Sequence, residues 1–193
     1  MKDQIWIRKV ILIAICISIS ACLQVFADHF IYLKPDLLTE FWRLWTAHWV
    51  HVGWIHFLLN MVAFACLPFI FPHVRNWHLV ALLCILPPFI SLIFYFFVPY
   101  IEAYAGLSGV LHGLYTAVGL VYLQYLNERK FAILVLASIA AKLLWENTFG
   151  QTGTAQLIGS PVLTEAHWIG ALGGLLCGLG YLFFVKLERE HIS

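Results

Sequence analysis

The sequence predicts an all-α membrane protein, a bundle of six transmembrane helices with both termini in the cytoplasm. Hydrophobic residues make up 62% of the 193 residues and charged residues only 11%, and the mean hydropathy is +0.88. This composition is far more apolar than that of an average soluble domain. Two further observations complete the prediction: the apolar residues form six long runs, and the basic residues between the runs are unevenly distributed.

Each of the six runs is long enough to cross a hydrocarbon core of about 30 Å. They cover residues 8–27, 50–71, 78–98, 108–126, 130–148 and 166–186. Most basic residues lie at the termini and in the second and fourth loops: Lys2, Arg8, Lys9, Arg75, Arg129, Lys130, Lys186 and Arg189. Cytoplasmic loops are enriched in Lys and Arg, so we expect the first, third and fifth loops to face outward. We also expect residues 1–193 to form one membrane domain.

The first apolar run has a second interpretation. Basic residues precede it, and Ile19-Ser20-Ala21-Cys22 resembles a lipoprotein cleavage box, which is the outline of a removable signal peptide. Cleavage would delete one span from an otherwise balanced arrangement of six. We therefore expect the run to be retained as the first span.

Charge and cysteine content exclude several classes of function. A formal net charge of +1 and the absence of a phosphate-binding loop argue against nucleic acid and nucleotides as partners. No cysteines form a CxxC pair, and all five lie in apolar runs: Cys16, Cys22, Cys66, Cys84 and Cys177. Cysteines in such positions behave as small apolar side chains. We expect no disulfide framework, no metal site and no cofactor.

Ser108 lies between glycines in Gly106-Leu107-Ser108-Gly109, where the fourth run begins. A reactive serine needs a base and donors for an oxyanion. The topology places Ser108 in the same leaflet as His51, His56 and His167. Each histidine alone is simply explained as an interfacial side chain, but together they indicate a site assembled from several helices.

The spacing of the polar residues suggests separate roles. His56 and Asn60 are four residues apart and share one helix face, so they could supply two donors. His51 lies about 140° around the helix from His56 and is expected to anchor the first loop instead. His112 follows Ser108 by four residues but points toward it from one turn deeper, where proton exchange with water is poorest.

His167 precedes two small residues of the sixth run, Gly170 and Gly174. This small-xxx-small pattern allows two membrane helices to approach closely. Pairing of this face with the fourth run would bring His167 to Ser108.

Together these motifs resemble those of rhomboid intramembrane serine proteases, in the same order along residues 40–175. The matching pieces are Trp42-Arg43, the His51/His56/Asn60 pattern, Gly106-Leu107-Ser108-Gly109, and Ala166-His167 with Gly170 and Gly174.

The resemblance implies a rhomboid-like bundle in which Ser108 is the nucleophile and His167 the general base, a dyad with no acidic third member. His56, Asn60 and the Ser108 backbone N–H would form the oxyanion hole. His51, Arg43 and Gly106 would have supporting roles. His112 stands where many rhomboids have a tyrosine that stacks on the catalytic histidine, so it would support His167 by stacking or by a hydrogen bond.

Within that family the chain is most similar to the rhombosortase subgroup. The similarity is carried by the stretch from Gly106 to Gly113 with its His112, by Trp145-Glu146, and by the compact chain. It implies an enzyme of the bacterial inner membrane, with its active site toward the periplasm. The implied partners are the lipid bilayer and single-pass, membrane-anchored substrates with a C-terminal Gly-Gly motif, membrane helix and basic tail. Acyl transfer to water or to an amine, and an accessory membrane protein, are compatible with this chemistry.

Two residues of the fifth run, Lys142 and Glu146, are ionisable and four positions apart. They could neutralise each other, or Glu146 could bind backbone N–H groups of a Gly-Gly substrate segment.

Two other functions have to be weighed against a protease. A non-catalytic relative that binds transmembrane segments would be expected to lack the serine or the histidine. A haem or metal protein would use His48, His51, His56 and His167, but no HExxH motif occurs, and those histidines would have to face one another across helices.

Overall fold

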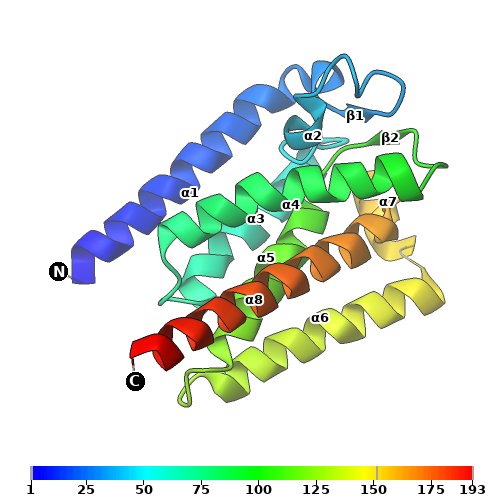
Figure 1. The fold of residues 1–193 in the computed structure, drawn as a ribbon. Coiled ribbons are helices and arrows are strands. Elements are labelled where there is room, and N and C mark those ends of the chain that lie inside the picture. Colours follow the sequence, from blue (N-terminus) through cyan, green and yellow to red (C-terminus); the bar gives the residue numbers. More distant parts are fainter. Residues whose placement is uncertain (1, 151, 193) are drawn as a thin grey trace.

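The computed structural model describes residues 2–150 and 152–192, and most of them are helical (Figure 1). The longer helices are α1 (Lys2–Gln24), α3 (Trp54–Ile70), α4 (Asn76–Phe97), α5 (Ser108–Tyr122), α6 (Arg129–Phe149) and α8 (Thr164–Ile192). The shorter elements are η1 (Ala27–His29), β1 (Tyr32–Leu33), α2 (Arg43–Thr46), β2 (Ala103–Tyr104) and α7 (Thr152–Ile158). Both chain ends lie at one end of the bundle, and the short elements lie at the other (Figure 1).

Within the described residues, four helices are long and apolar enough to cross a membrane: α1, α4, α6 and α8. The chain is therefore a multi-pass membrane protein. α3 is also apolar but has 17 residues, and α5 has 15. At 1.5 Å per residue, α5 is only about 22 Å long, which is shorter than a hydrocarbon core.

A helix lies at each of the six apolar runs, but several boundaries differ from the predicted ones. α1 begins at Lys2 and α8 continues to Ile192, because helical hydrogen bonding extends into charged residues beyond the end of an apolar run. α3 begins at Trp54 after an extended Gly53. His51 consequently lies in the loop before α3, not on the helix as the apolar run suggested.

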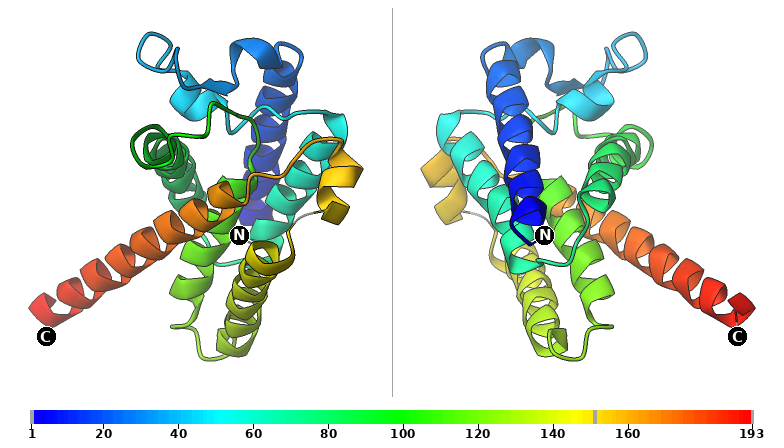
Figure 2. Two further views of the ribbon diagram at one scale, coloured as in Figure 1. Left: turned by 90° about the vertical axis from the view of Figure 1, so that its right-hand side faces the viewer. Right: turned by 90° about the vertical axis from the view of Figure 1, so that its left-hand side faces the viewer.

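α5 lies at the centre of the bundle and contacts α3, α4, α6 and α8 (Figure 2). Its closest approach is to α8, through glycines on both helices. A Cβ atom at Gly109 would lie 2.7 Å from the carbonyl oxygen of Ala166, and one at Gly113 would lie 2.6 Å from that of Gly170. Only glycine permits this backbone contact. The C-terminal half of α8 extends away from the other helices (Figure 2).

The segment between α1 and α3 is folded onto the end of the bundle. Arg43 is buried, and its Nη1 donates to the backbone oxygens of Ile31 at 2.6 Å and Asp28 at 3.3 Å. The indole of Trp45 donates to the carbonyl oxygen of Cys84 at 2.9 Å. That carbonyl has no helical partner, because the residue four positions later is Pro88, which lacks an N–H. α4 thus offers a fixed attachment point to α2.

A short antiparallel pairing, which the sequence did not suggest, joins this segment to the loop before α5. Tyr32 of β1 faces Tyr104 of β2, and Leu33 faces Ala103. The Lys34 N–H extends the ladder by donating to the Glu102 carbonyl at 3.0 Å. The first loop therefore positions the residues that lead into Ser108.

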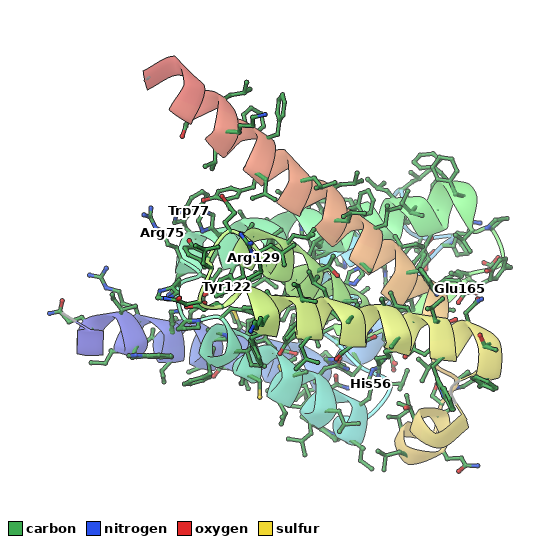
Figure 3. The ribbon with its side chains drawn as sticks, turned by 90° about the horizontal axis from the view of Figure 1, so that it is seen from below. His56, Arg75, Trp77, Tyr122, Arg129 and Glu165 are labelled. Atoms are coloured by element: carbon green, nitrogen blue, oxygen red, sulfur yellow. The ribbon has the colours of Figure 1, made fainter. Side chains whose placement is uncertain are left out.

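The opposite end of the bundle is closed by different contacts. The Tyr122 hydroxyl accepts hydrogen bonds from the N–H groups of His73 and Val74, the second at 3.1 Å. In Figure 3, Tyr122 lies near Arg75 and Arg129, far from His56 and Glu165. The polar residues discussed below therefore gather at one end only.

Candidate active site

The turn that precedes Ser108 depends on Gly106. Its φ of +145° belongs to the region that favours glycine, and a Cβ atom there would lie 2.8 Å from Cε1 of His56. The Gly106 N–H donates to the Ala47 carbonyl at 3.0 Å, and the Tyr104 hydroxyl donates to the Gly106 carbonyl at 2.6 Å. Strand pairing and first-loop contacts thus hold this turn from both sides.

His51 holds the next residue of the same turn. Its Nε2 accepts a hydrogen bond from the Leu107 N–H at 3.4 Å. Burial, followed by the nearby His56, lowers the pKa of His51 to about 3. The neutral ring keeps its Nε2 lone pair available at physiological pH. His51 therefore contacts the turn that leads into Ser108.

Ser108 is the first residue of α5, and its hydroxyl is within hydrogen-bonding distance of His167. Ser108 Oγ and His167 Nε2 are 2.9 Å apart. The first i to i−4 hydrogen bond of α5 runs from the Leu111 N–H to the Leu107 carbonyl. The N–H groups before Leu111 in the first turn consequently have no acceptor within their own helix. A helix start of this kind favours negative charge.

His56 and Asn60 face the same cavity as Ser108. The cavity has a volume of about 290 Å³. Asn60 Nδ2 donates one hydrogen to the His56 carbonyl at 3.0 Å, which leaves its second amide hydrogen for another acceptor. His56 Nδ1 is buried and has no hydrogen-bond partner within the described part of the chain. The cavity also contacts residues of α5, α6, α7 and α8: Leu111, His112, Tyr115, Ile139, Lys142, Thr154, Ile158 and His167.

His112 packs against one face of the His167 ring. The rings of His112 and His167 stack with centroids 4.2 Å apart and planes inclined by 20°. His112 Nδ1 lies 2.7 Å from the Ser108 carbonyl oxygen, so this nitrogen carries the proton and donates. His112 therefore stacks on His167 while its hydrogen bond stays within α5.

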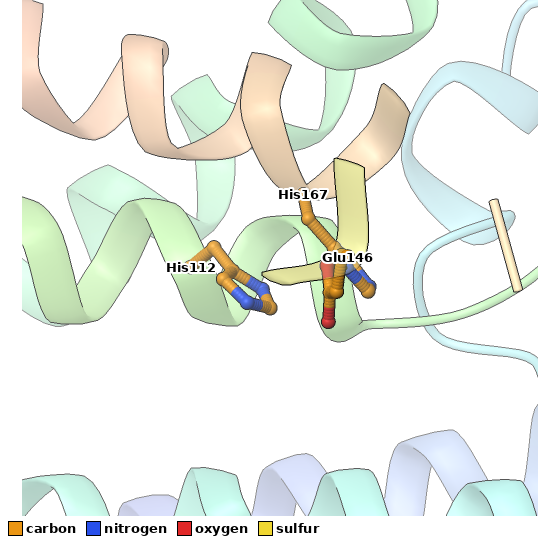
Figure 4. Close-up of side chains that lie close together, drawn as sticks. All are labelled: His112, Glu146 and His167. Carbon is orange, nitrogen blue, oxygen red and sulfur yellow. The ribbon is translucent and has the colours of Figure 1, made fainter. Parts of the chain in front are cut away.

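Glu146 reaches the other side of His167. Its Oε2 lies 2.7 Å from His167 Nδ1, and its Oε1 is paired with the Lys142 ammonium group. Only 1% of the Glu146 side chain is exposed. Figure 4 shows the side chains of His112, Glu146 and His167 converging from α5, α6 and α8.

This geometry differs from one expectation. The sequence led us to expect no acidic group beside the dyad, whereas a carboxylate is bonded to the second nitrogen of His167. Glu146 does not line the cavity at Ser108, but it lines a second cavity between α6 and α7, so its contact with substrate stays a prediction. The spacing of Lys142 and Glu146 indicated an ion pair. Periodicity alone could not show that α6 turns the carboxylate toward His167.

Of the histidines considered as metal or haem ligands, His51 and His56 lie side by side with ring centroids 5.0 Å apart, but His48 has a different partner. His48 Nε2 lies 3.0 Å from Ser91 Oγ, and burial lowers the pKa of His48 to about 3. A different group, His112, Glu146 and His167, offers potential ligand atoms within 4.8 Å of one another. An ion there would have to displace the hydrogen bond between Glu146 and His167 and would lie beside the Lys142 ammonium. The hydrogen bonds account for this cluster more directly.

A hydroxyl bonded to an imidazole, which is bonded in turn to a carboxylate, is an arrangement suited to acyl transfer. Ser108 at the start of α5 and the side chains of His56 and Asn60 on α3 line the same cavity. Comparison with protein families gives a match to a model described as the Rhomboid domain, over residues 38–186. Comparison with curated proteins gives no significant match.

Proposed function

Because the chain belongs to the rhomboid family, whose members are generally intramembrane serine proteases, we propose that it is a serine endopeptidase that cleaves membrane-anchored proteins within the bilayer. The observation that carries the proposal is the 2.9 Å separation of Ser108 Oγ and His167 Nε2. An intact nucleophile and base at this distance favour catalysis over a protein that only binds transmembrane segments.

The first step forms an acyl-enzyme. His167 Nε2 takes the proton of the Ser108 hydroxyl as Oγ attacks the scissile carbonyl carbon. The resulting oxyanion is stabilised by the Ser108 backbone N–H and by the side chains of His56 and Asn60. As the intermediate collapses, the peptide C–N bond breaks, and His167 returns the proton to the leaving amine.

The second step releases the acyl group from Ser108. A water molecule gives a proton to His167 Nε2 as its oxygen attacks the ester carbonyl carbon. The bond from that carbon to Ser108 Oγ then breaks, His167 returns the proton to Oγ, and the product leaves as a carboxylic acid that ionises to a carboxylate. An amine nucleophile would follow the same route and produce a new amide bond in place of the carboxylate.

We place this chemistry in a six-span protein with cytoplasmic termini and an outward-facing site. The helices at all six apolar runs and the basic residues of the termini and second and fourth loops support this topology. The shortness of α5 supports a site below the membrane surface, where the irregular backbone before Ser108 lines a cavity and contacts protein instead of lipid.

Within the family we propose a rhombosortase-like substrate class: exported bacterial proteins with a C-terminal Gly-Gly motif, a membrane helix and a basic tail. Support comes from the sequence around Ser108, with His112 four residues later, and from Trp145-Glu146. The corresponding location is the bacterial inner membrane, with the active site toward the periplasm.

Labelling by a serine-reactive fluorophosphonate tests the proposal. Purified wild-type protein in detergent should be labelled, and Ser108→Ala and His167→Ala should not. On a membrane-tethered Gly-Gly substrate both variants should lose cleavage while retaining the wild-type unfolding temperature. Near-wild-type turnover by either variant would exclude the pair as the catalytic groups. Equal cleavage of an Ala-Ala substrate would reject only the substrate class.

A further inference from the structure

Glu146 is the most deeply buried carboxylate described near Ser108. It lies on α6 and is 4% exposed. One oxygen is bonded to His167 Nδ1 at 2.7 Å and the other is paired with Lys142. The Lys142 side chain is 49% exposed and lines the cavity beside Ser108, whereas the carboxylate is buried.

We propose that Glu146 is the positioning residue of a Ser–His–Glu triad, a role that rests on the proposed protease function. A carboxylate can only accept at His167 Nδ1, so Nδ1 must carry the proton in the resting protein. Nε2 then presents its lone pair to Ser108 Oγ, 2.9 Å away. When His167 takes the serine proton, the adjacent negative charge stabilises the imidazolium.

The packing of three helices produces this alignment. α8 contacts α5 through glycines, which brings His167 to Ser108, and α6 packs against both helices. His112 restricts one face of the imidazole by stacking, but it makes no hydrogen bond to His167. Among the described contacts of the His167 ring, the hydrogen bond to Glu146 is the one that fixes which nitrogen carries the proton.

Lys142 offsets the free-energy cost of burying the Glu146 carboxylate. An ionised carboxylate without a partner is costly inside a membrane protein. The pair at positions 142 and 146 supplies that partner from the preceding helical turn. The sequence suggested mutual neutralisation or substrate contact for this pair. The ion pair is present, and the proposal adds that it leaves the other carboxylate oxygen to bond His167.

Glu146→Gln is the decisive substitution. The amide can donate to Nδ1 and so favour the tautomer that places a proton on Nε2, facing Ser108. We expect kcat to fall by about 10² to 10⁴, with KM changed less than threefold. The rate of fluorophosphonate labelling should fall in parallel, since that small reagent needs the activated serine but not the substrate contacts.

Glu165→Gln provides the matched control. Glu165 lies two residues from His167 and accepts a hydrogen bond from the Tyr100 hydroxyl at 2.7 Å, with none to His167 among the described contacts. This variant should retain wild-type kcat and labelling. A loss equal to that of Glu146→Gln would show that the reaction requires negative charge near His167 in general and not the Glu146 hydrogen bond in particular, and would overturn the positioning role.

The double variant Lys142→Met/Glu146→Gln covers the case in which the single variant fails to fold, because it leaves no unpaired ammonium group on α6. It should fold and remain slow in kcat. Wild-type kcat in a folded Glu146→Gln or double variant, or a raised KM with unchanged kcat, would overturn the proposal. Labelling of Ser108→Ala at the wild-type rate would instead reject the proposed function itself, so the two failures are distinguishable.

Discussion

Single residues around Ser108 supply donors whose loss should slow the reaction without stopping it. Removal of one oxyanion donor in acyl-transfer sites costs roughly 10² to 10³ in turnover. We expect losses of this size for Asn60→Ala and for His56→Ala, measured as kcat on a tethered substrate. Leu58→Ala is the control, because Leu58 is on the same helix but 61% exposed and outside the cavity lining. Wild-type rates in both variants would leave α3 without a catalytic role.

His112 makes two contacts at the site, a stacking contact and a hydrogen bond, and their effects on the rate can be separated by substitution. Its ring stacks on His167, and its Nδ1 donates to the Ser108 carbonyl. An aromatic pair contributes about 0.5–1.5 kcal/mol beyond burial, which corresponds to roughly 2- to 12-fold in rate. His112→Ala should lose that factor in kcat, whereas His112→Phe should keep most of it. The opposite order would show that the hydrogen bond, and not the stacking, matters.

At the level of elements, the contact between α5 and α8 determines whether Ser108 and His167 meet. A Cβ atom at Gly113 would lie 2.6 Å from the Gly170 carbonyl oxygen, so the backbones would have to separate. We expect Gly113→Ala to destabilise the protein by about 1–3 kcal/mol and to reduce fluorophosphonate labelling.

Gly180→Ala is the control for this prediction. Gly180 is on α8, but a Cβ atom there would have no neighbour within 4 Å. Thermal unfolding in detergent should show a lowered midpoint for Gly113→Ala only. An unchanged midpoint and labelling rate would mean that the helices can separate without loss of the site.

For the molecule as a whole, two buried histidines should make the site end of the bundle sensitive to acid. Burial lowers the pKa of His48 and of His51 to about 3, from an ordinary 6.5. Their contribution to stability is complete above pH 6.5. It is lost as the pH falls from 6.5 toward 3, because the unfolded chain binds these protons first.

The expected loss is roughly 1 kcal/mol per pH unit for each histidine within that window. Unfolding midpoints at several pH values would measure it. His48→Gln keeps a donor for Ser91 and should show a shallower dependence below pH 6.5 than the wild type. Identical curves for the two proteins would contradict the prediction.

Much of this arrangement can be inferred from local patterns in the chain. Apolar runs predict helices, since each span must satisfy its own backbone hydrogen bonds in lipid, and helices occur at all six runs. The residues singled out by spacing, Ser108, His167, His56 and Asn60, line one cavity. The small face of Gly170 and Gly174 predicted a close helix approach, and α8 makes that approach to α5.

The rotation of the helices and the docking of the loops depend on which helix faces pack together. The hydropathy pattern of the chain does not specify these faces. The rotation of α6 about its axis, set by packing against α5 and α8, turns Glu146 toward His167. The pairing of β1 with β2 joins segments about 70 residues apart, Tyr32 with Tyr104. The sequence by itself therefore determined the helices and the residues capable of chemistry. Only the tertiary structure decided the partner of each polar atom, because helix rotation and loop docking result from contacts between residues distant in the chain.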